Sequence, residues 1–315
     1  MSILVTGGAG FIGSHLAEAL LARGESVTCL DNFDPFYDPA AKRRNLEQAS
    51  ESERFRLVEG DIRDIGLLRE LLGDGSIRCV VHLAAKAGVQ PSLRDALAYQ
   101  EVNVTGTVTV LEAMRESDVQ QLIFGASSSV YGGNPDVPFS EDAELVCQIS
   151  PYAASKRACE LYCRTYHHLH GIPTTCLRFF TVHGPRQRPD LAIHLFTHKI
   201  LAGETITMYG NQSRDCTYVS DIIDGVLAAI DRPLDFEIIN LGDSRPVTVR
   251  QMIAAIEEAT GVEAKIEHAP ERPGDPPTTY ADISKAGQLL DYDPKVSLED
   301  GVRRFVEWHR EAEPT

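Results

Sequence analysis

The stretch Ile3-Leu4-Val5-Thr6-Gly7-Gly8-Ala9-Gly10-Phe11-Ile12-Gly13-Ser14-His15 decides how the N-terminal half of this chain folds. An apolar, β-branched run leads directly into Gly7, Gly10 and Gly13, which recur every three residues, and then into a run that favours helix. Glycines permit a tight turn and let a pyrophosphate approach the backbone, where free N–H groups at a helix N-terminus meet its charge. Glycine spacing alone is weak evidence, but its position between a strand and a helix predicts a dinucleotide site.

A second strand, expected at Val27–Asp31, ends in Asp31-Asn32, shortly after the glycines. A carboxylate at this point accepts hydrogen bonds from ribose hydroxyls and repels a 2′-phosphate, so NAD is favoured over NADP. The alternative is that Asp31 only caps a helix or forms a turn, since Asp is common in turns. Asp61-Ile62 follows the third expected strand and is placed by its position at the adenine end.

Short apolar runs alternate with helical stretches over roughly the first 180 residues. The expected strands are Ile3–Thr6, Val27–Asp31, Phe55–Glu59, Cys79–Leu83, Gln121–Ala126 and Thr174–Phe179, and the expected helices are Ser14–Arg23, Ile65–Leu72, Val102–Glu116 and 152–170. This alternation predicts an α/β fold with a doubly wound parallel Rossmann sheet. The strands are almost continuously apolar, as expected when helices cover both faces.

The pattern loosens after about residue 182 and predicts a smaller, mostly helical substrate-binding lobe. Helices are expected at Ala192–Ala202, Ser220–Ile230, Val249–Thr260 and over the last thirty residues, with a loop at Gly210–Asp215 and a strand at Glu237–Leu241. We therefore predict a Rossmann domain over 1–181 to which 216–248 return, and a substrate lobe formed by 182–215 and 249–315.

The charge balance of this 315-residue chain is strongly acidic, with 30 basic and 46 acidic residues. Nucleic acids and anionic membranes are bound by basic surfaces, so neither is an expected partner. No apolar run approaches the roughly 18 residues of a membrane span, and no signal peptide precedes the first strand.

The seven cysteines are odd in number and form no CxxC pair, which predicts free thiols in a reducing, cytoplasmic compartment. Several histidines cluster in the second half of the chain, at positions 167, 168, 170, 194 and 198, without a HExxH or two-His-one-carboxylate arrangement. No metal site is therefore expected.

A second informative stretch is Ser150-Pro151-Tyr152-Ala153-Ala154-Ser155-Lys156. Tyr152 and Lys156 are four residues apart behind a proline-marked helix start, so both lie on one helix face. A free phenol is a weak base at neutral pH, but a nearby ammonium favours its phenolate form. In isolation the pair reads equally well as an exposed helical pair. Ser127, however, ends a predicted strand at the edge of the sheet where α/β enzymes bind ligands.

Taken together, TGGAGFIGSH, Leu83–Ala85, SSSVYG at Ser127–Gly132, YAASK and the later RDCTYVSD resemble the extended short-chain dehydrogenase/reductase family over nearly the whole chain. Within that family the segment Arg178–Asp190 is similar to UDP-glucuronate 4-epimerases, which carry RFFTVYGPxxRPD. This chain departs from that pattern at His183, where a Tyr is usual, and at Arg186-Gln187, where Trp-Gly is usual. Both departures leave the substrate preference open.

The resemblance implies a role for each matching residue. Tyr152 would be the base, Lys156 would bind the nicotinamide ribose, and Ser127 would hold the sugar 4-hydroxyl. The implied cofactor-binding residues are Gly7, Gly10, Phe11, Ile12, Gly13, Asp31, Asn32, Asp61, Ile62, Leu83, Ala84, Ala85, Lys86, Tyr152 and Lys156. The implied substrate-binding residues are Gly88, Val89, Ser128, Ser129, Thr181, Arg188, Arg214, Arg272 and Asp275. Arg214 and Arg272 would bind the diphosphate, for which a guanidinium is well suited.

The reaction implied is NAD-dependent epimerisation at C4 of a UDP-sugar, with UDP-glucuronate converted to UDP-galacturonate through a transient 4-keto intermediate. A UDP-glucose/UDP-galactose 4-epimerase is the first alternative. A nucleotide-sugar 4,6-dehydratase or uronate decarboxylase is the second alternative. Enzymes of both kinds generally place an acidic residue after the catalytic hydroxyl, where this chain has Ser128 and Ser129. A non-catalytic NAD-binding regulator is a further alternative. The resemblance also implies a homodimer through helices near 95–115 and 152–170.

Overall fold

The large sheet is parallel throughout and places the glycine loop at its centre. The computed structural model describes residues 1–270, 274 and 276–312. Its main sheet contains β1 (Ser2–Thr6), β2 (Ser26–Asp31), β3 (Phe55–Glu59), β4 (Ile77–His82), β5 (Gln121–Ser127), β6 (Thr174–Phe179) and β10 (Phe236–Leu241). In the described part of the chain the strand order is β10-β6-β5-β4-β1-β2-β3. The order reverses between β1 and β4, where such sheets open a crevice at the carboxyl ends of their strands.

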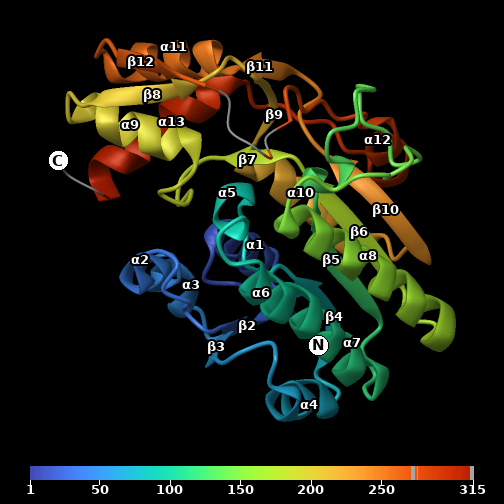
Figure 1. The fold of residues 1–315 in the computed structure, drawn as a ribbon. Helices are drawn as coiled ribbons and strands as arrows, with labels where there is room; N and C mark the ends of the chain where they lie inside the picture. The colour runs from blue at the N-terminus through green and yellow to red at the C-terminus, as the bar shows by residue number, and fades with distance from the viewer. Residues whose placement is uncertain (271–273, 275, 313–315) are drawn as a thin grey trace.

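Helices cover both faces of this sheet, because successive strand residues point to opposite sides. Ile3 and Val5 pack with α1 (Phe11–Ala22), α10 (Val219–Asp231) and α12 (Ser284–Leu290). Leu4 packs on the other side with α4 (Ile65–Gly73), α7 (Gly106–Arg115) and α8 (Pro151–His170). Figure 1 shows α4, α7 and α8 along one face of the sheet. The predicted Rossmann fold is confirmed.

The second lobe has its own apolar core, formed by α9 (Ala192–Leu201), α11 (Val249–Thr260), α13 (Leu298–Ala312) and β8 (Thr205–Tyr209). β8 pairs with β12 (Lys265–Ala269), and β7 (Thr181–His183), β9 (Ser213–Tyr218) and β11 (Pro246–Thr248) form a three-stranded sheet. Figure 1 shows α9, α11 and α13 grouped with the β8–β12 pair at one end of the molecule. These cores support the division into two interleaved lobes, which stays a prediction.

Two local predictions were wrong. Part of the expected loop at Gly210–Asp215 belongs to β9, because its residues from Ser213 to Asp215 pair with β11. The last thirty residues are not continuously helical, since 291–297 separate α12 from α13. The expected helix at Val102–Glu116 is present: a π-helical turn at Gln100–Thr105 leads directly into α7.

Short elements complete the cofactor side of the sheet. They are α2 (Pro39–Arg44), α3 (Glu47–Ser50), α5 (Val89–Ser92), α6 (Ala96–Tyr99) and the 3-10 turn η2 (Ser128–Tyr131). α5 follows the loop after β4, and η2 follows β5 directly. Both therefore lie beside the carboxyl ends of strands, which ligands approach.

A buried ion pair holds α8 against the sheet. Arg178 donates from Nε and Nη2 to the two carboxylate oxygens of Glu160, at 2.8 and 2.9 Å, and from Nη1 to the Tyr131 hydroxyl at 2.9 Å. The Tyr131 hydroxyl in turn donates to Asn240 Oδ1 at 2.7 Å. The network therefore fixes η2, which follows Ser127, relative to the helix that carries Tyr152.

All seven cysteines lie within the described residues, and none forms a disulfide. Six are buried and only Cys147 is exposed. Burial raises the pKa of Cys29, Cys79 and Cys216 to about 12.

Buried histidines predict a loss of stability in mild acid. Burial lowers the pKa of His183 to about 4 and that of His82 to about 3, against about 6.5 in an unfolded chain. The unfolded state therefore binds more protons below pH 6.5, so their stabilising contribution is complete above that pH and is lost as pH falls toward 4. Each histidine is expected to lower the free energy of unfolding by about 1.4 kcal/mol per pH unit in this window.

Chemical denaturation of wild type and His183→Phe, measured at several pH values between 4.5 and 6.5, checks this expectation. The variant removes the titrating group and keeps a ring against Tyr218, whose ring centroid lies 5.6 Å from that of His183. Its free energy of unfolding should depend less steeply on pH. Equal slopes for the two proteins would contradict the prediction.

Candidate active site

One cavity of about 460 Å³ runs along the carboxyl ends of the parallel strands. Its wall contains the predicted cofactor-binding residues Gly7, Gly10, Phe11, Ile12, Gly13, Asp31, Asn32, Asp61, Ile62, Leu83, Ala84, Ala85 and Lys86. It also contains Ser127, Tyr152 and Lys156 and the predicted substrate-binding residues Gly88, Val89, Ser128, Ser129, Thr181, Arg188 and Arg214. Arg272 and Asp275 lie outside the described residues.

The glycine loop is packed so closely that side chains are excluded. Gly7 has φ +70°, and a Cβ at this position would lie 2.7 Å from the Ala84 nitrogen. A Cβ on Gly13 would lie 2.3 Å from the Gly7 carbonyl oxygen. Gly10 precedes α1, and no side chain caps that helix start in the part of the chain described. The first N–H groups of α1 therefore suit a pyrophosphate.

Asp31 combines a turn role with a place on the cavity wall. Its carboxylate oxygens accept from the Ala9 nitrogen at 3.1 Å and the Phe33 nitrogen at 2.8 Å. Asn32 donates to Asp61 Oδ2 at 3.1 Å, and hydrogen bonds from Arg63 lower the pKa of Asp61 to about 2. Both acidic residues are therefore ordered at the end where an adenosine ribose would bind.

Tyr152 and Lys156 come from the first two turns of α8. Ser150 caps this helix by accepting from the Ala153 nitrogen at 3.1 Å, and Pro151 occupies its first position, where a missing N–H costs little. Lys156 is buried and donates from Nζ to the Gly125 carbonyl oxygen at 2.6 Å. Its place under the cavity is thus set by β5.

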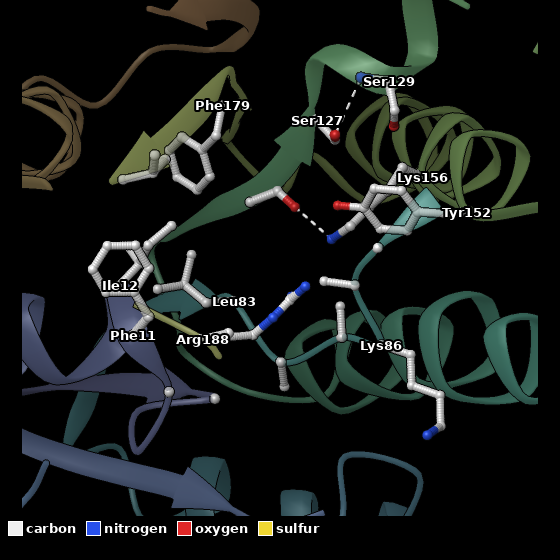
Figure 2. A pocket seen from close by; sticks show the side chains of 18 of the residues that line it. Phe11, Ile12, Leu83, Lys86, Ser127, Ser129, Tyr152, Lys156, Phe179 and Arg188 are labelled. Carbon is white, nitrogen blue, oxygen red and sulfur yellow. Dashed lines mark hydrogen bonds between the residues drawn. The ribbon is translucent and has the colours of Figure 1, made fainter. Parts of the chain in front are cut away.

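Ser127 ends β5 beside these two residues. Its hydroxyl accepts from the Ser129 nitrogen at 3.2 Å. Figure 2 shows the Tyr152 hydroxyl and the Lys156 ammonium grouped near Ser127, with dashed lines for the bonds made by Ser127 and Lys156. The arrangement can hold a substrate hydroxyl between a serine and a phenol, with a cation next to the phenol.

Polar side chains outside the group formed by Ser127, Tyr152 and Lys156 also line the cavity. The Ser129 hydroxyl is buried and has no hydrogen-bond partner within the described residues. Arg188 extends into the cavity and donates from Nε and Nη2 to Asp190 at 2.9 and 2.8 Å. Arg214 donates to the Ser213 carbonyl oxygen at 2.8 Å. A buried hydroxyl and two guanidinium groups suit an anionic, hydroxylated ligand.

Sequence analysis missed several wall residues. The loop after β2 contributes Asp34, Phe36 and Tyr37, and α2 contributes Lys42, whose Nζ donates to the Asp34 carbonyl oxygen at 2.9 Å. The aromatic residues directly after the strand end Asp31-Asn32 were the available signal. Asn103 was also missed. It does not line the wall but bonds the backbone of Lys86 at 2.7 and 3.0 Å and thereby holds the loop after β4.

The two departures from the epimerase pattern do not reach the cavity. His183 is fully buried against Tyr218, and neither His183 nor Arg186 is among the residues of the cavity wall. These departures therefore make no direct contact with a ligand in it.

The described residues offer neither a metal site nor a membrane-spanning helix. They contain no group of three or more His, Cys, Asp or Glu placed to hold a metal ion. None of their helices has the length and apolar character that crossing a bilayer requires.

The sequence of this chain is similar to known proteins over nearly its whole length. The family described as GDP-mannose 4,6 dehydratase matches residues 4–305. An uncharacterized protein, MJ1055, of Methanocaldococcus jannaschii is 44% identical, over 98% of this chain and 96% of that protein. A UDP-glucuronate 4-epimerase of Thermodesulfobacterium geofontis is 41% identical over the same shares.

A solved structure agrees in the whole fold. The UDP-glucuronic acid 4-epimerase of Bacillus cereus, in complex with UDP-glucuronic acid and NAD, superposes with a TM-score of 0.94 at 37% identity. The match covers 99% of this chain and 100% of that one.

Proposed function

Because the chain belongs to the extended short-chain dehydrogenase/reductase family that includes the UDP-glucuronate 4-epimerases, we propose that it interconverts UDP-glucuronate and UDP-galacturonate with bound NAD. The observation that carries this proposal is that Tyr152, Lys156 and Ser127 meet the glycine loop in one cavity. The cavity thus places a base, a cation and a hydroxyl group beside the glycine loop that would bind the dinucleotide.

The residues present fit NAD. The closely packed glycines leave room for a pyrophosphate at the start of α1. The Asp31 carboxylate at the ribose end would accept hydrogen bonds from the ribose hydroxyls and repel a 2′-phosphate. Leu83, Ala84 and Ala85 would line the nicotinamide side, and Lys156 would bind its ribose. When bound, NAD accepts two electrons from C4 of the sugar and returns them.

Tyr152 takes the proton of the sugar 4-hydroxyl as C4 is oxidised to a ketone, and it gives the proton back when C4 is reduced on its other face. Lys156 places a positive charge near the Tyr152 hydroxyl (Figure 2), where it would stabilise the negative charge that develops on that oxygen as the proton moves. Ser127 holds the 4-oxygen during both halves. The configuration at C4 inverts and no net oxidation remains, so the enzyme is expected to retain its cofactor.

The C6 carboxylate of the sugar decides between the candidate substrates. Ser128, Ser129 and Thr181 lie on the same part of the wall, and the buried Ser129 hydroxyl has no acceptor among the described residues. A uronate supplies that acceptor. Holding this carboxylate also protects the 4-keto intermediate, a β-keto acid, from losing CO₂. Arg214 and Arg272 would bind the diphosphate, and Arg188, Asp275, Gly88 and Val89 would complete the substrate site.

The test is turnover without added cofactor. Purified protein is incubated with UDP-glucuronate and, separately, with UDP-glucose, and the products are followed by proton NMR. Selective formation of UDP-galacturonate is expected. Turnover of UDP-glucose alone would transfer the assignment to galactose epimerisation, and a UDP-pentose or a 4-keto product would overturn the epimerase proposal.

We also propose a cytoplasmic homodimer. Exposed apolar side chains gather on the helices expected to pair: Leu97 of α6 is 76% exposed, and Leu161 and Leu169 of α8 are 51% and 63% exposed. Apolar patches of this kind support contact with a second copy. The free thiols support a reducing compartment.

A further inference from the structure

The segment between β7 and α9 contacts α1, the first helix of the Rossmann domain, and also contributes to the cavity wall. It begins at Gly184 and includes Pro185, Arg186, Gln187 and Arg188. Arg186 has a positive φ of +66°, as only three other non-glycine residues do in the described part of the chain. That conformation is unfavourable for a residue with a Cβ, so surrounding contacts must hold it.

Two contacts join this segment to α1. Arg186 donates from Nη2 to Glu18 Oε1 at 2.7 Å, and the two side chains are only 17% and 20% exposed. One turn earlier on α1, His15 donates from Nε2 to the Pro185 carbonyl oxygen at 2.9 Å. Because these contacts are partly buried, water and salt screen them less than they screen ion pairs on the open surface.

Contacts on the other side hold the same segment to the second lobe. His194 of α9 donates from Nδ1 to the Gln187 carbonyl oxygen at 2.7 Å. Arg188, the next residue, extends into the cavity and bonds Asp190. A Cβ on Gly88, which belongs to the Rossmann side of the cavity, would lie 3.5 Å from Arg188 Nη2.

We propose that Arg186 is a positioning residue: its ion pair with Glu18, with the His15–Pro185 bond, clasps the segment to α1 and thereby sets Arg188 against the substrate. The clasp occupies the Arg186-Gln187 position at which this chain departs from the epimerase pattern. The inference rests on the proposed function for its substrate. It assigns to this departure an indirect role, because Arg186 itself does not line the cavity.

The test compares four variants of the NAD-loaded enzyme. Arg186→Ala and Glu18→Ala are expected to raise KM for UDP-glucuronate about tenfold, since small displacements of a positioning group weaken binding. The kcat value and the content of bound NAD should change less than about twofold. The charge-swapped double variant Glu18→Arg/Arg186→Glu should restore KM to within about threefold of wild type, because the pair is re-formed with its charges exchanged.

Arg69→Ala is the matched control. It breaks the Arg69–Glu116 pair, which joins α4 to the end of α7 at 2.7 and 3.0 Å on the exposed surface and is not part of the cavity wall. Its KM should equal that of wild type. A KM for Arg186→Ala that also equals wild type, or no restoration in the double variant, would overturn the proposal.

Hydrogen exchange separates this inference from the proposed function. The backbone amides between the two prolines and after them, at positions 186, 187, 188, 190 and 191, should exchange faster in Arg186→Ala. They should return to the wild-type rate in the double variant, whether or not UDP-glucuronate is a substrate. Unchanged exchange in Arg186→Ala would overturn the clasp. Absence of turnover by the wild-type enzyme would overturn the proposed substrate alone.

Discussion

Tyr152→Phe is expected to lower kcat about a thousandfold, within the range that a lost general base costs. The variant removes one hydroxyl group and keeps the ring, which packs edge-on against Tyr99 with centroids 6.1 Å apart. Lys156 and Ser127 already bond the Gly125 carbonyl and the Ser129 nitrogen, so neither replaces the missing base. Bound NAD and KM should remain near wild type. Initial rates by NMR and NAD content after denaturation measure both effects.

The matched control is Tyr162→Phe. Tyr162 lies on the same helix but is 42% exposed, so the same chemical change there should leave kcat unaltered. A Tyr152→Phe enzyme that kept more than about a tenth of the wild-type kcat would show that another group removes the proton.

Gly13→Ala is expected to abolish retention of NAD. The added Cβ would lie 2.3 Å from the Gly7 carbonyl oxygen and 2.7 Å from the Gly8 Cα. These are backbone atoms, so the loop itself must move, and the N–H groups at the start of α1 move out of register with a pyrophosphate. The purified variant should release no NAD on denaturation and should turn over no substrate unless the cofactor is added in excess.

Gly73→Ala provides the comparison. Gly73 ends α4, and apart from its chain neighbours and the backbone of its own helix no described heavy atom lies within 4 Å of the position that its Cβ would take. Alanine there should stabilise the protein by about 0.5–1 kcal/mol through helix propensity and leave NAD content unchanged. Full NAD occupancy in Gly13→Ala would contradict the importance of this close packing.

Much of the Rossmann half could be predicted because its signals are local. Most of its strands are short, largely apolar runs, and α8 begins where Ser150-Pro151 predicts, although α1 already begins at Phe11, before the expected start at Ser14. The second lobe gave weaker signals. β8 pairs with β12, which lies some sixty residues later, and both strands are partly exposed, so neither periodicity nor apolar content marked them.

The residues of the site could likewise be predicted only where their signals are local in the sequence. Residues at strand ends were found because a parallel sheet brings those ends to one edge. Tyr37 and Lys42 reach the cavity only because the loop after β2 folds back over it. The ion pair between Arg186 and Glu18 joins residues far apart in the chain, and no spacing rule relates them.

The single exposed thiol gives this protein a built-in attachment point. Maleimide reagents react with accessible thiolates, and burial protects the other six cysteines while the protein stays folded. A Cβ on Gly132, which lines the cavity, would lie 2.0 Å from the Cys147 carbonyl oxygen. A fluorophore coupled to Cys147 would therefore stand directly behind the cavity wall, where its emission can report the arrival of a sugar nucleotide without any engineered cysteine.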